Sequence, residues 1–234
     1  MKEYSKQSKL IAAIDCIIFG FDGQHLKILL IKRGFKPAMN KWSLMGGFVK
    51  NNEGFDKAAN RILKQLTGLE GIYLEQLYAF GDPKRDPIGR TISVAYFALI
   101  DIHKYEKQIS HEYHAEWFNI NKAPRLIFDH DEMVKMAREK LRYKAGLHPI
   151  LFELLPPKFT VLQLQTLYEE IYSTSLDKRN FIRKILSTGL LIKQKEKDKK
   201  TSKRGAYYFK VDKKKYKKQF GSFLNIIPNS HKLW

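Results

Sequence analysis

The chain has 234 residues, a formal net charge of +19 and a sequence pI near 9.8, which favours a polyanionic partner such as nucleic acid or an anionic membrane surface. A hydrophobic fraction of 44% supports a buried core. The single cysteine, Cys16, excludes an internal disulfide and suits a reducing compartment, and no apolar stretch is long enough to span a bilayer. We therefore expect a cytoplasmic protein without a membrane anchor.

Two apolar segments near the start of the chain predict a β-hairpin. Residues 11–21 and 27–33 are rich in Ile, Leu and Phe, and the turn-forming pair Asp22-Gly23 lies between them. Asp15 interrupts the first segment, which argues against a signal peptide. Cys16 lies in the same apolar segment, so we expect it to be a buried structural thiol.

A Gly-rich turn and a helix follow the hairpin. Gly46 and Gly47 precede Glu53 and a helix-like run over about residues 54–67, and Gly68 is placed to end this helix. The apolar side of the run contains Leu63, Leu66 and Leu69. A Gly-Gly turn that leads into an acidic loop and a helix is a common way to hold a metal-bound phosphate.

The next segments predict a mixed sheet between helices. Strands are expected at residues 74–80 and 91–100, with a loop dense in Pro, Gly and charge between them, and a short strand within residues 114–120. A second amphipathic helix is expected over residues 128–143, with an apolar side formed by Met133, Met136, Ala137 and Leu141. Strands before and after one helix, with another helix late, are typical of an α/β fold.

The composition changes near residues 144–146, where we place a domain boundary. Thr160 and Gln163 form a capping-box pattern that opens a helix, and Asp177 is a suitable N-cap for another helix that Gly189 closes. Short apolar strands flank a Lys-rich turn beyond this helix, so the segment predicts a winged helix-turn-helix. The low-complexity basic tail at residues 210–218, taken alone, indicates a solvated or disordered end.

The helix that begins at Lys178 is the expected DNA-reading element. Its buried side is predicted to contain Phe181, Ile182, Ile185 and Leu186. Its outward residues are of types that contact base edges and phosphates. The basic wing from Lys193 to Arg204 can contact the DNA backbone. A solvated helix face is the simpler alternative for the outward residues of the helix. The candidate DNA-binding residues are Thr160, Gln163, Lys178, Arg179, Asn180, Arg183, Lys184, Lys200, Lys203 and Arg204.

The segment from Gly47 to Leu69 resembles the Nudix box, whose family pattern reads G-x5-E-x7-R-E-U-x-E-E-x-G-U with U an aliphatic residue. The matching positions are Gly47, Glu53, Arg61, Leu63, Gly68 and Leu69. The three family glutamates fall on Ile62, Gln65 and Leu66, none of which is acidic, and Met45 stands where the family usually has Pro. The resemblance implies an α/β/α sandwich over roughly residues 8–145 whose box has kept its scaffold and lost its metal ligands. We therefore expect no hydrolase activity, no bound metal and no cofactor.

A retained small-molecule site is expected near the mouth of this Nudix-like fold. Residues 80–100 resemble the ADP-ribose-handling branch of the family. The candidate effector-binding residues are Trp42, Arg85, Asp86, Arg90, Asp129 and His130. Ordinary surface loops and a helix cap are the alternative interpretation of these six residues.

Residues 154–171 and 176–186 resemble the C-terminal domain of the Nudix-related transcriptional regulators, so the resemblance extends over nearly the whole chain. It implies a homodimeric bacterial repressor that leaves its double-stranded DNA operator when a small molecule binds the Nudix-like half. We predict an α/β protein with a Nudix-like α/β/α sandwich over residues 1–145, followed by a winged helix-turn-helix domain over residues 146–234.

Three functions remain open at this point. The arabinose-utilisation repressors are the nearest branch by resemblance, which makes L-arabinose the expected effector. The first alternative is an ADP-ribose-sensing repressor of NAD metabolism. The alternative of another class is an active Nudix pyrophosphohydrolase, in which Asp56, Glu112 or Glu116 would have to compensate for the missing glutamates.

Overall fold

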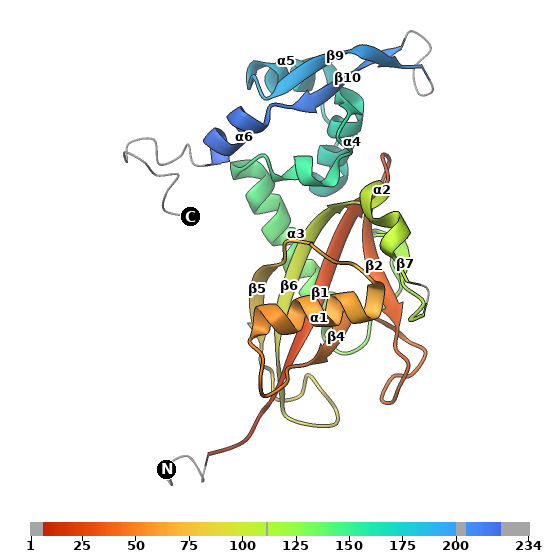
Figure 1. The fold of residues 1–234 in the computed structure, drawn as a ribbon, viewed down its shortest axis with the longest axis vertical. Helices are drawn as coiled ribbons and strands as arrows, with labels where there is room; N and C mark the ends of the chain where they lie inside the picture. Colours follow the sequence, from red (N-terminus) through yellow and green to blue (C-terminus); the bar gives the residue numbers. More distant parts are fainter. Residues whose placement is uncertain (1–6, 111, 200–204, 221–234) are drawn as a thin grey trace, which may run out of the picture. The chain divides into compact units, whose positions relative to one another are not determined.

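The computed structural model describes residues 7–110, 112–199 and 205–220 (Figure 1). The chain forms two compact units, which we describe separately. Within the described residues, the first unit comprises 7–19, 27–99 and 105–137, and the second comprises 20–26, 100–104 and the chain from 138 onward.

The first unit is built on a seven-stranded sheet with the order β3-β2-β1-β6-β5, in which β4 also pairs with β1 and β7 with β2. The strands are β1 (Ile11–Phe21), β2 (Leu26–Lys32), β3 (Trp42–Ser43), β4 (Met45–Phe48), β5 (Glu75–Phe80), β6 (Thr91–Asp101) and β7 (Glu116–Asn119). The last nine residues of β1 are buried in succession, so both faces of this central strand are covered. The predicted hairpin and later strands are thus confirmed.

Two long helices pack against the sheet. Helix α1 (Phe55–Thr67) crosses the strands in Figure 1, and the buried side chains of α3 (His130–Leu147) include Met133 and Ala137. Short helices α2 (Ile102–Tyr105) and η1 (Glu106–Gln108) follow β6. Helix α1 ends at Gly68 as predicted, with φ +79°, and a Cβ there would lie 2.2 Å from the Gln108 carbonyl oxygen.

The second unit contains the predicted winged helix. Its elements are η2 (Ile150–Leu154), β8 (Phe159–Thr160), α4 (Val161–Tyr172), α5 (Lys178–Ser187), β9 (Leu191–Asp198), β10 (Ala206–Val211) and α6 (Lys213–Phe220). The strands form a sheet with the order β8-β10-β9. The rings of Tyr168 and Phe181 meet edge to face at 5.6 Å and join α4 to α5.

Three details differ from the sequence predictions. The expected division between residues 145 and 146 falls inside α3, which continues to Leu147. The basic tail is not an unstructured end, because it completes β10 and forms α6, where the Tyr216 hydroxyl donates to Glu153 at 2.9 Å. Leu186 is 43% exposed and therefore does not belong to the buried side of α5, unlike the half-buried Phe181 and Ile185.

The tip of the β1–β2 hairpin is part of the second unit. There the Glu170 carboxylate of α4 accepts a hydrogen bond from the Leu26 backbone N–H at 3.1 Å and lies 3.5 Å from His25 Nδ1. The hairpin therefore takes part in both units. No helix among the described residues is long and apolar enough to cross a membrane.

Candidate functional site

A cavity of about 550 Å³ opens in the first unit beside the Gly46–Gly47 turn. This volume is within the range of about 300–1,000 Å³ that small-molecule sites occupy. Its ionisable lining residues are Asp15, Arg33, Lys50, Arg61, Arg85, Asp86, Tyr113 and His130. Four of them are permanent cations, of which Arg61 is paired with Glu53 and Arg85 with Asp129. An anionic ligand would therefore be bound mainly by Arg33 and Lys50.

A buried ion-pair network forms one wall of the cavity. Arg85 donates from Nε and from a terminal nitrogen to the two oxygens of Asp129, both at 2.8 Å, and its guanidinium lies 3.5 Å from Asp15. The Asp15 carboxylate also accepts a 2.6 Å hydrogen bond from the Ser93 hydroxyl. Because the Arg85 side chain is only 4% exposed, this network fixes the loop of residues 81–90 against β1 and the start of α3.

His130 extends the network at the first residue of α3. Its Nδ1 accepts a hydrogen bond from the Leu44 backbone N–H at 3.2 Å, and its Nε2 lies 3.5 Å from Asp15. Burial lowers the pKa of His130, although the nearby carboxylates of Asp15 and Asp129 oppose this shift. The imidazole is therefore neutral at pH 7, with Nδ1 as the acceptor.

The glycines of the turn allow the backbone to approach this wall closely. A Cβ on Gly46 would lie 2.4 Å from Oδ1 of Asp15, and a Cβ on Gly47 would lie 3.0 Å from the Ile62 side chain. Any larger residue at Gly46 would displace the Asp15 carboxylate, which is buried in β1. The Gly-Gly pair is thus needed for the shape of the cavity.

The six candidate effector residues divide into two groups. Arg85, Asp86 and His130 line the cavity, and Asp129 holds Arg85 in place. Trp42 and Arg90 lie elsewhere: the Trp42 ring packs edge to face against Phe118 at 4.7 Å, and Arg90 donates to the Gly81 carbonyl at 2.8 Å. Both of these residues support local structure instead of lining the cavity.

Sequence reasoning missed several cavity residues. Asp15, Arg33 and Lys50 line the cavity, yet none of them was a candidate. Lys50 lies inside the Nudix-box segment, at a position that the family pattern leaves open, and Asp15 and Arg33 lie outside that segment. Asp15 was the one with a usable signal, since a carboxylate inside a buried apolar strand requires a partner. Arg33 and Lys50 follow strand ends and carry no such signal.

The residues of the Nudix-box segment do not fit a divalent cation. Glu53 receives hydrogen bonds from Arg61 Nε at 2.9 Å and from the Lys50 backbone N–H at 2.9 Å, and the bond from Arg61 holds the pKa of Glu53 down at about 2. Ile62 and Leu66 offer no oxygen, and Gln65 offers only a neutral carbonyl. Within the described residues, no three His, Cys, Asp or Glu side chains are grouped as metal ligands would be.

The residues considered as replacements do not restore the ligand set. The Asp56 carboxylate accepts a 2.5 Å hydrogen bond from the Tyr96 hydroxyl, whose pKa is raised by burial and by this carboxylate. Neither Glu112 nor Glu116 lines the cavity. We therefore derive no metal-dependent step from this site.

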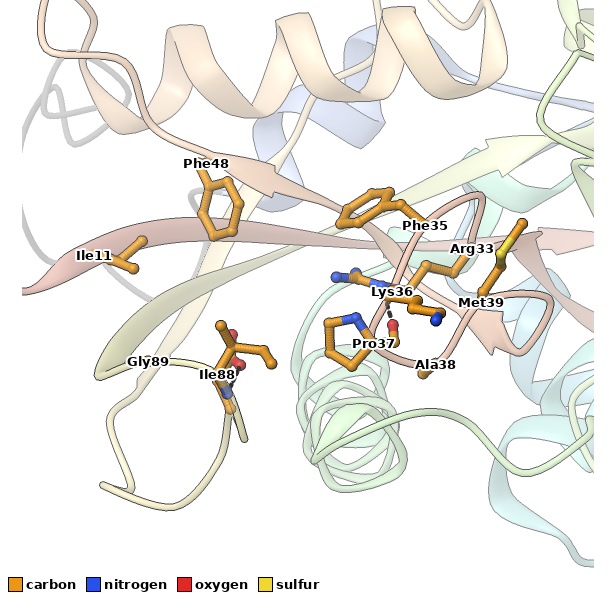
Figure 2. Close-up of a pocket in the computed structure, with 11 residues that line it drawn as sticks. Ile11, Arg33, Phe35, Lys36, Pro37, Ala38, Met39, Phe48, Ile88 and Gly89 are labelled. Carbon is orange, nitrogen blue, oxygen red and sulfur yellow. Dashed lines mark hydrogen bonds between the residues drawn. The ribbon is translucent and has the colours of Figure 1, made fainter.

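A second, largely apolar hollow of about 760 Å³ adjoins the cavity and shares Arg33, Phe35, Phe48 and Asp86 with it. Figure 2 shows its lining: Phe48, Ile11 and Ile88 lie across from Phe35, Pro37 and Met39. The Phe35 ring lies 3.9 Å from the Arg33 guanidinium, which also donates to the Pro37 carbonyl at 2.7 Å. Exposed aromatic rings beside a fixed guanidinium are suited to a flat, aromatic ligand group.

Helix α5 presents the cationic surface of the second unit. Asp177 caps it by accepting from the Asn180 backbone N–H at 2.8 Å, as predicted. Lys178, Arg179, Asn180, Arg183 and Lys184 are all exposed, and the Asn180 side-chain oxygen accepts from Arg183 at 2.9 Å. These side chains are available to a nucleic acid.

The wing adds a cluster that the sequence analysis did not single out. The ammonium groups of Lys193 and Lys197 lie 3.7 Å and 4.5 Å from the Tyr207 ring centre, on neighbouring strands β9 and β10. The predicted wing residues Lys200, Lys203 and Arg204 lie outside the described residues.

Thr160 and Gln163 have a structural role at the start of α4, and in Thr160 this role conflicts with DNA contact. Thr160 accepts from the Gln163 backbone N–H at 3.2 Å, and Gln163 accepts from the Thr160 backbone N–H at 2.8 Å. This is the predicted capping box, and it leaves Thr160 only 2% exposed. The assignment of Thr160 to the DNA surface is therefore corrected to a helix cap.

Comparison with known families agrees with this two-part architecture. Residues 9–138 match the NUDIX domain family, and residues 151–211 match the NrtR DNA-binding winged helix domain. The chain is 34% identical over 225 residues to a protein of Acinetobacter baylyi named ADPR responsive transcriptional repressor NtrR, covering 94% of this chain and 89% of that protein. The chain belongs to the NrtR-type Nudix regulators.

Solved structures of this family resemble the chain along most of its length. The crystal structure of Shewanella oneidensis NrtR complexed with a 27mer DNA is 28% identical, with a TM-score of 0.75, and covers 88% of this chain and 95% of that chain. The NUDIX domain of the same protein, complexed with ADP ribose, is 29% identical, with a TM-score of 0.50, and covers 59% of this chain and 94% of that chain. The arabinose branch finds no support among these relatives, and the ADP-ribose alternative is favoured.

Proposed function

We propose that this NrtR-type protein is a transcriptional repressor that binds double-stranded DNA and is released from it by ADP-ribose. The observation that carries the proposal is the 34% identity, over 94% of the chain, to a repressor named as ADPR responsive. The complexes of the Shewanella oneidensis relative with DNA and with ADP ribose support the same two ligands. L-arabinose is set aside as the effector.

The geometry of the first unit suits ADP-ribose. A cation-lined cavity provides for a pyrophosphate, and the adjoining aromatic hollow provides for a nucleobase. A pentose alone has no negative charge for Arg33 and Lys50 and no nucleobase for the hollow. The effector site therefore comprises the cavity and the hollow together.

The second unit would provide the DNA contacts. Helix α5 enters the major groove with Asn180 and Arg183 near the bases, and the β9–β10 wing contacts the backbone through its lysines. We further propose a homodimer, whose two α5 helices must match half-sites one helical turn apart or a multiple of it. ADP-ribose then needs only to favour a dimer geometry in which this spacing is wrong.

A thermal-shift panel tests the effector assignment. The full chain is heated with ADP-ribose, NAD, L-arabinose and ribose 5-phosphate in parallel. We expect ADP-ribose to raise the Tm, because a ligand that binds only the folded state stabilises it by mass action. A larger shift with arabinose than with ADP-ribose would refute the assignment.

A further inference from the structure

The position of the family's metal site lacks the carboxylates that hold a divalent cation. The Ile62 side chain is only 2% exposed and lies against the backbone of Gly47, where a Cβ would come within 3.0 Å of it. Leu66 and Gln65 line the same side of the cavity. Two aliphatic groups and one neutral amide carbonyl thus stand where the family has three carboxylates, which is too few charged oxygens to hold a divalent cation.

The carboxylates that remain nearby are already engaged. Glu53 is bound by Arg61 and by the Lys50 backbone, and Asp15 is bound by Ser93 and faces Arg85. Moving either carboxylate to a metal would break these bonds, and at Asp15 it would also leave the buried Arg85 with a weaker counter-charge.

Two side-chain cations, Arg33 and Lys50, line the cavity instead. The Arg33 guanidinium is held between the Pro37 carbonyl, at 2.7 Å, and the Phe35 ring, at 3.9 Å. Both of these partners are uncharged, although the carboxylates of Asp86 and Asp15 act on Arg33 through space. A phosphate that enters the cavity would therefore share the Arg33 guanidinium with these two carboxylates. Lys50 brings an exposed ammonium group to the same cavity from the loop before α1.

We propose that Arg33 and Lys50 replace the divalent cation, so that the cavity binds the pyrophosphate of ADP-ribose directly and without a metal. This inference rests on the proposed function, since it takes ADP-ribose as the ligand. A guanidinium offers a rigid fork of N–H donors to phosphate oxygens, and an ammonium adds a point charge. The protein therefore binds its signal without activating a water molecule against it.

Calorimetric titration of the full chain with ADP-ribose tests this directly. One titration contains EDTA, and the other contains millimolar Mg²⁺. We expect dissociation constants that agree within about twofold. Binding that is lost in EDTA and restored by Mg²⁺ would overturn the metal-free site while leaving ADP-ribose as the effector. Absence of binding in both buffers would overturn the proposed function itself and the metal-free site with it.

Two variants identify the cations. Arg33→Ala and Lys50→Ala should each weaken ADP-ribose binding at least tenfold in EDTA. The matched control is Lys57→Ala, which removes an exposed lysine of α1 outside the cavity and should leave binding unchanged. Equal binding by the control and by both cavity variants would refute the assignment, provided that their Tm values match the wild type.

A gain-of-dependence variant gives a second measurement. Gln65→Glu combined with Leu66→Glu returns two carboxylates to the cavity. It should weaken binding at least tenfold in EDTA through charge repulsion and recover part of that loss in Mg²⁺. Unchanged binding of this variant in EDTA would contradict a site that depends on its positive charge.

Discussion

The Arg85 guanidinium and the Asp129 carboxylate are joined by two parallel hydrogen bonds of 2.8 Å, although 44 residues separate them in the chain. The pair connects the loop of residues 81–90 to the residue that precedes α3, a helix that contributes to both units. The Arg85 side chain is almost wholly buried. The stability of the pocket wall therefore depends on this pair.

Asp129→Ala should lower the free energy of unfolding by about 3 kcal/mol, because breaking a buried ion pair leaves an uncompensated charge. Asp15 lies 3.5 Å from Arg85 and would still offset part of its charge, so the expected loss of unfolding free energy is near the lower end of the range for buried ion pairs. Urea unfolding followed by circular dichroism measures it. The control Arg90→Ala removes an exposed guanidinium and should cost less than about 1 kcal/mol. Equal stabilities of the two variants would show that the pair does not hold the wall.

The stability of the protein should fall as the pH drops below about 6.5, in part because of His130. Burial lowers the pKa of His130 in the folded state, so the unfolded chain binds a proton at a higher pH than the folded chain does. The contribution of His130 is thus fully present above its unfolded pKa and is lost as the pH falls toward its folded pKa.

The measurement is Tm against pH from 5 to 7.5 for the wild type and for His130→Asn. The Tm of the variant should decrease less steeply as the pH falls. Expressed as unfolding free energy, the difference between the two slopes should be up to about 1.4 kcal/mol per pH unit. His103→Asn, which alters an exposed histidine, should keep the wild-type slope. A wild-type slope in His130→Asn would assign the pH dependence to other groups.

Asn180 and Arg183 are the pair that we expect to contact bases. Each alanine variant should weaken binding to a specific duplex by about 1–3 kcal/mol and have little effect on a scrambled duplex. The described wing residue Lys195 serves as the comparison, since Lys195→Ala should weaken both duplexes alike and reduce the salt slope by about one. The same behaviour is predicted for Lys200→Ala. Gel shifts at several salt concentrations measure these effects. If both α5 variants bind the specific duplex with wild-type affinity, an element other than α5 contacts the bases.

Glu170 should couple the effector site to DNA binding. Its carboxylate holds the tip of the β1–β2 hairpin, and the same strand β1 carries Asp15 into the cavity. Glu170→Ala should keep ADP-ribose affinity and DNA affinity when each is measured alone, but it should reduce the effect of one on the other at least fivefold. Gln24→Ala, at the exposed end of the same hairpin, is the control. Unchanged coupling in Glu170→Ala would exclude this contact as the connection.

Local signals in the sequence were sufficient for most elements. The capping box of Thr160 and Gln163, the N-cap at Asp177 and the closing Gly68 each depend on residues within a few positions, so the pattern alone predicts them. The same capping chemistry explains why Thr160 was wrongly placed on the DNA surface, since its side chain satisfies the backbone.

The pocket wall could not be predicted in this way. The hydrogen bond between Ser93 and Asp15 spans 78 residues, and no spacing rule connects them. Asp86 and Arg90 are close in sequence and both carry a charge, yet only Asp86 lines the cavity, because the Arg90 side chain donates to the Gly81 carbonyl. Side-chain direction within an irregular loop depends on tertiary partners that sequence periodicity does not encode.

Release of this protein from DNA by ADP-ribose can be measured in one experiment. The most direct measurement is the fluorescence anisotropy of a labelled duplex, selected by the protein from random sequence, during titration with ADP-ribose in the presence of EDTA. ADP-ribose should lower the anisotropy to the value of free duplex, and L-arabinose at the same concentrations should have no effect. Anisotropy that stays constant as ADP-ribose saturates the protein would contradict the proposed release.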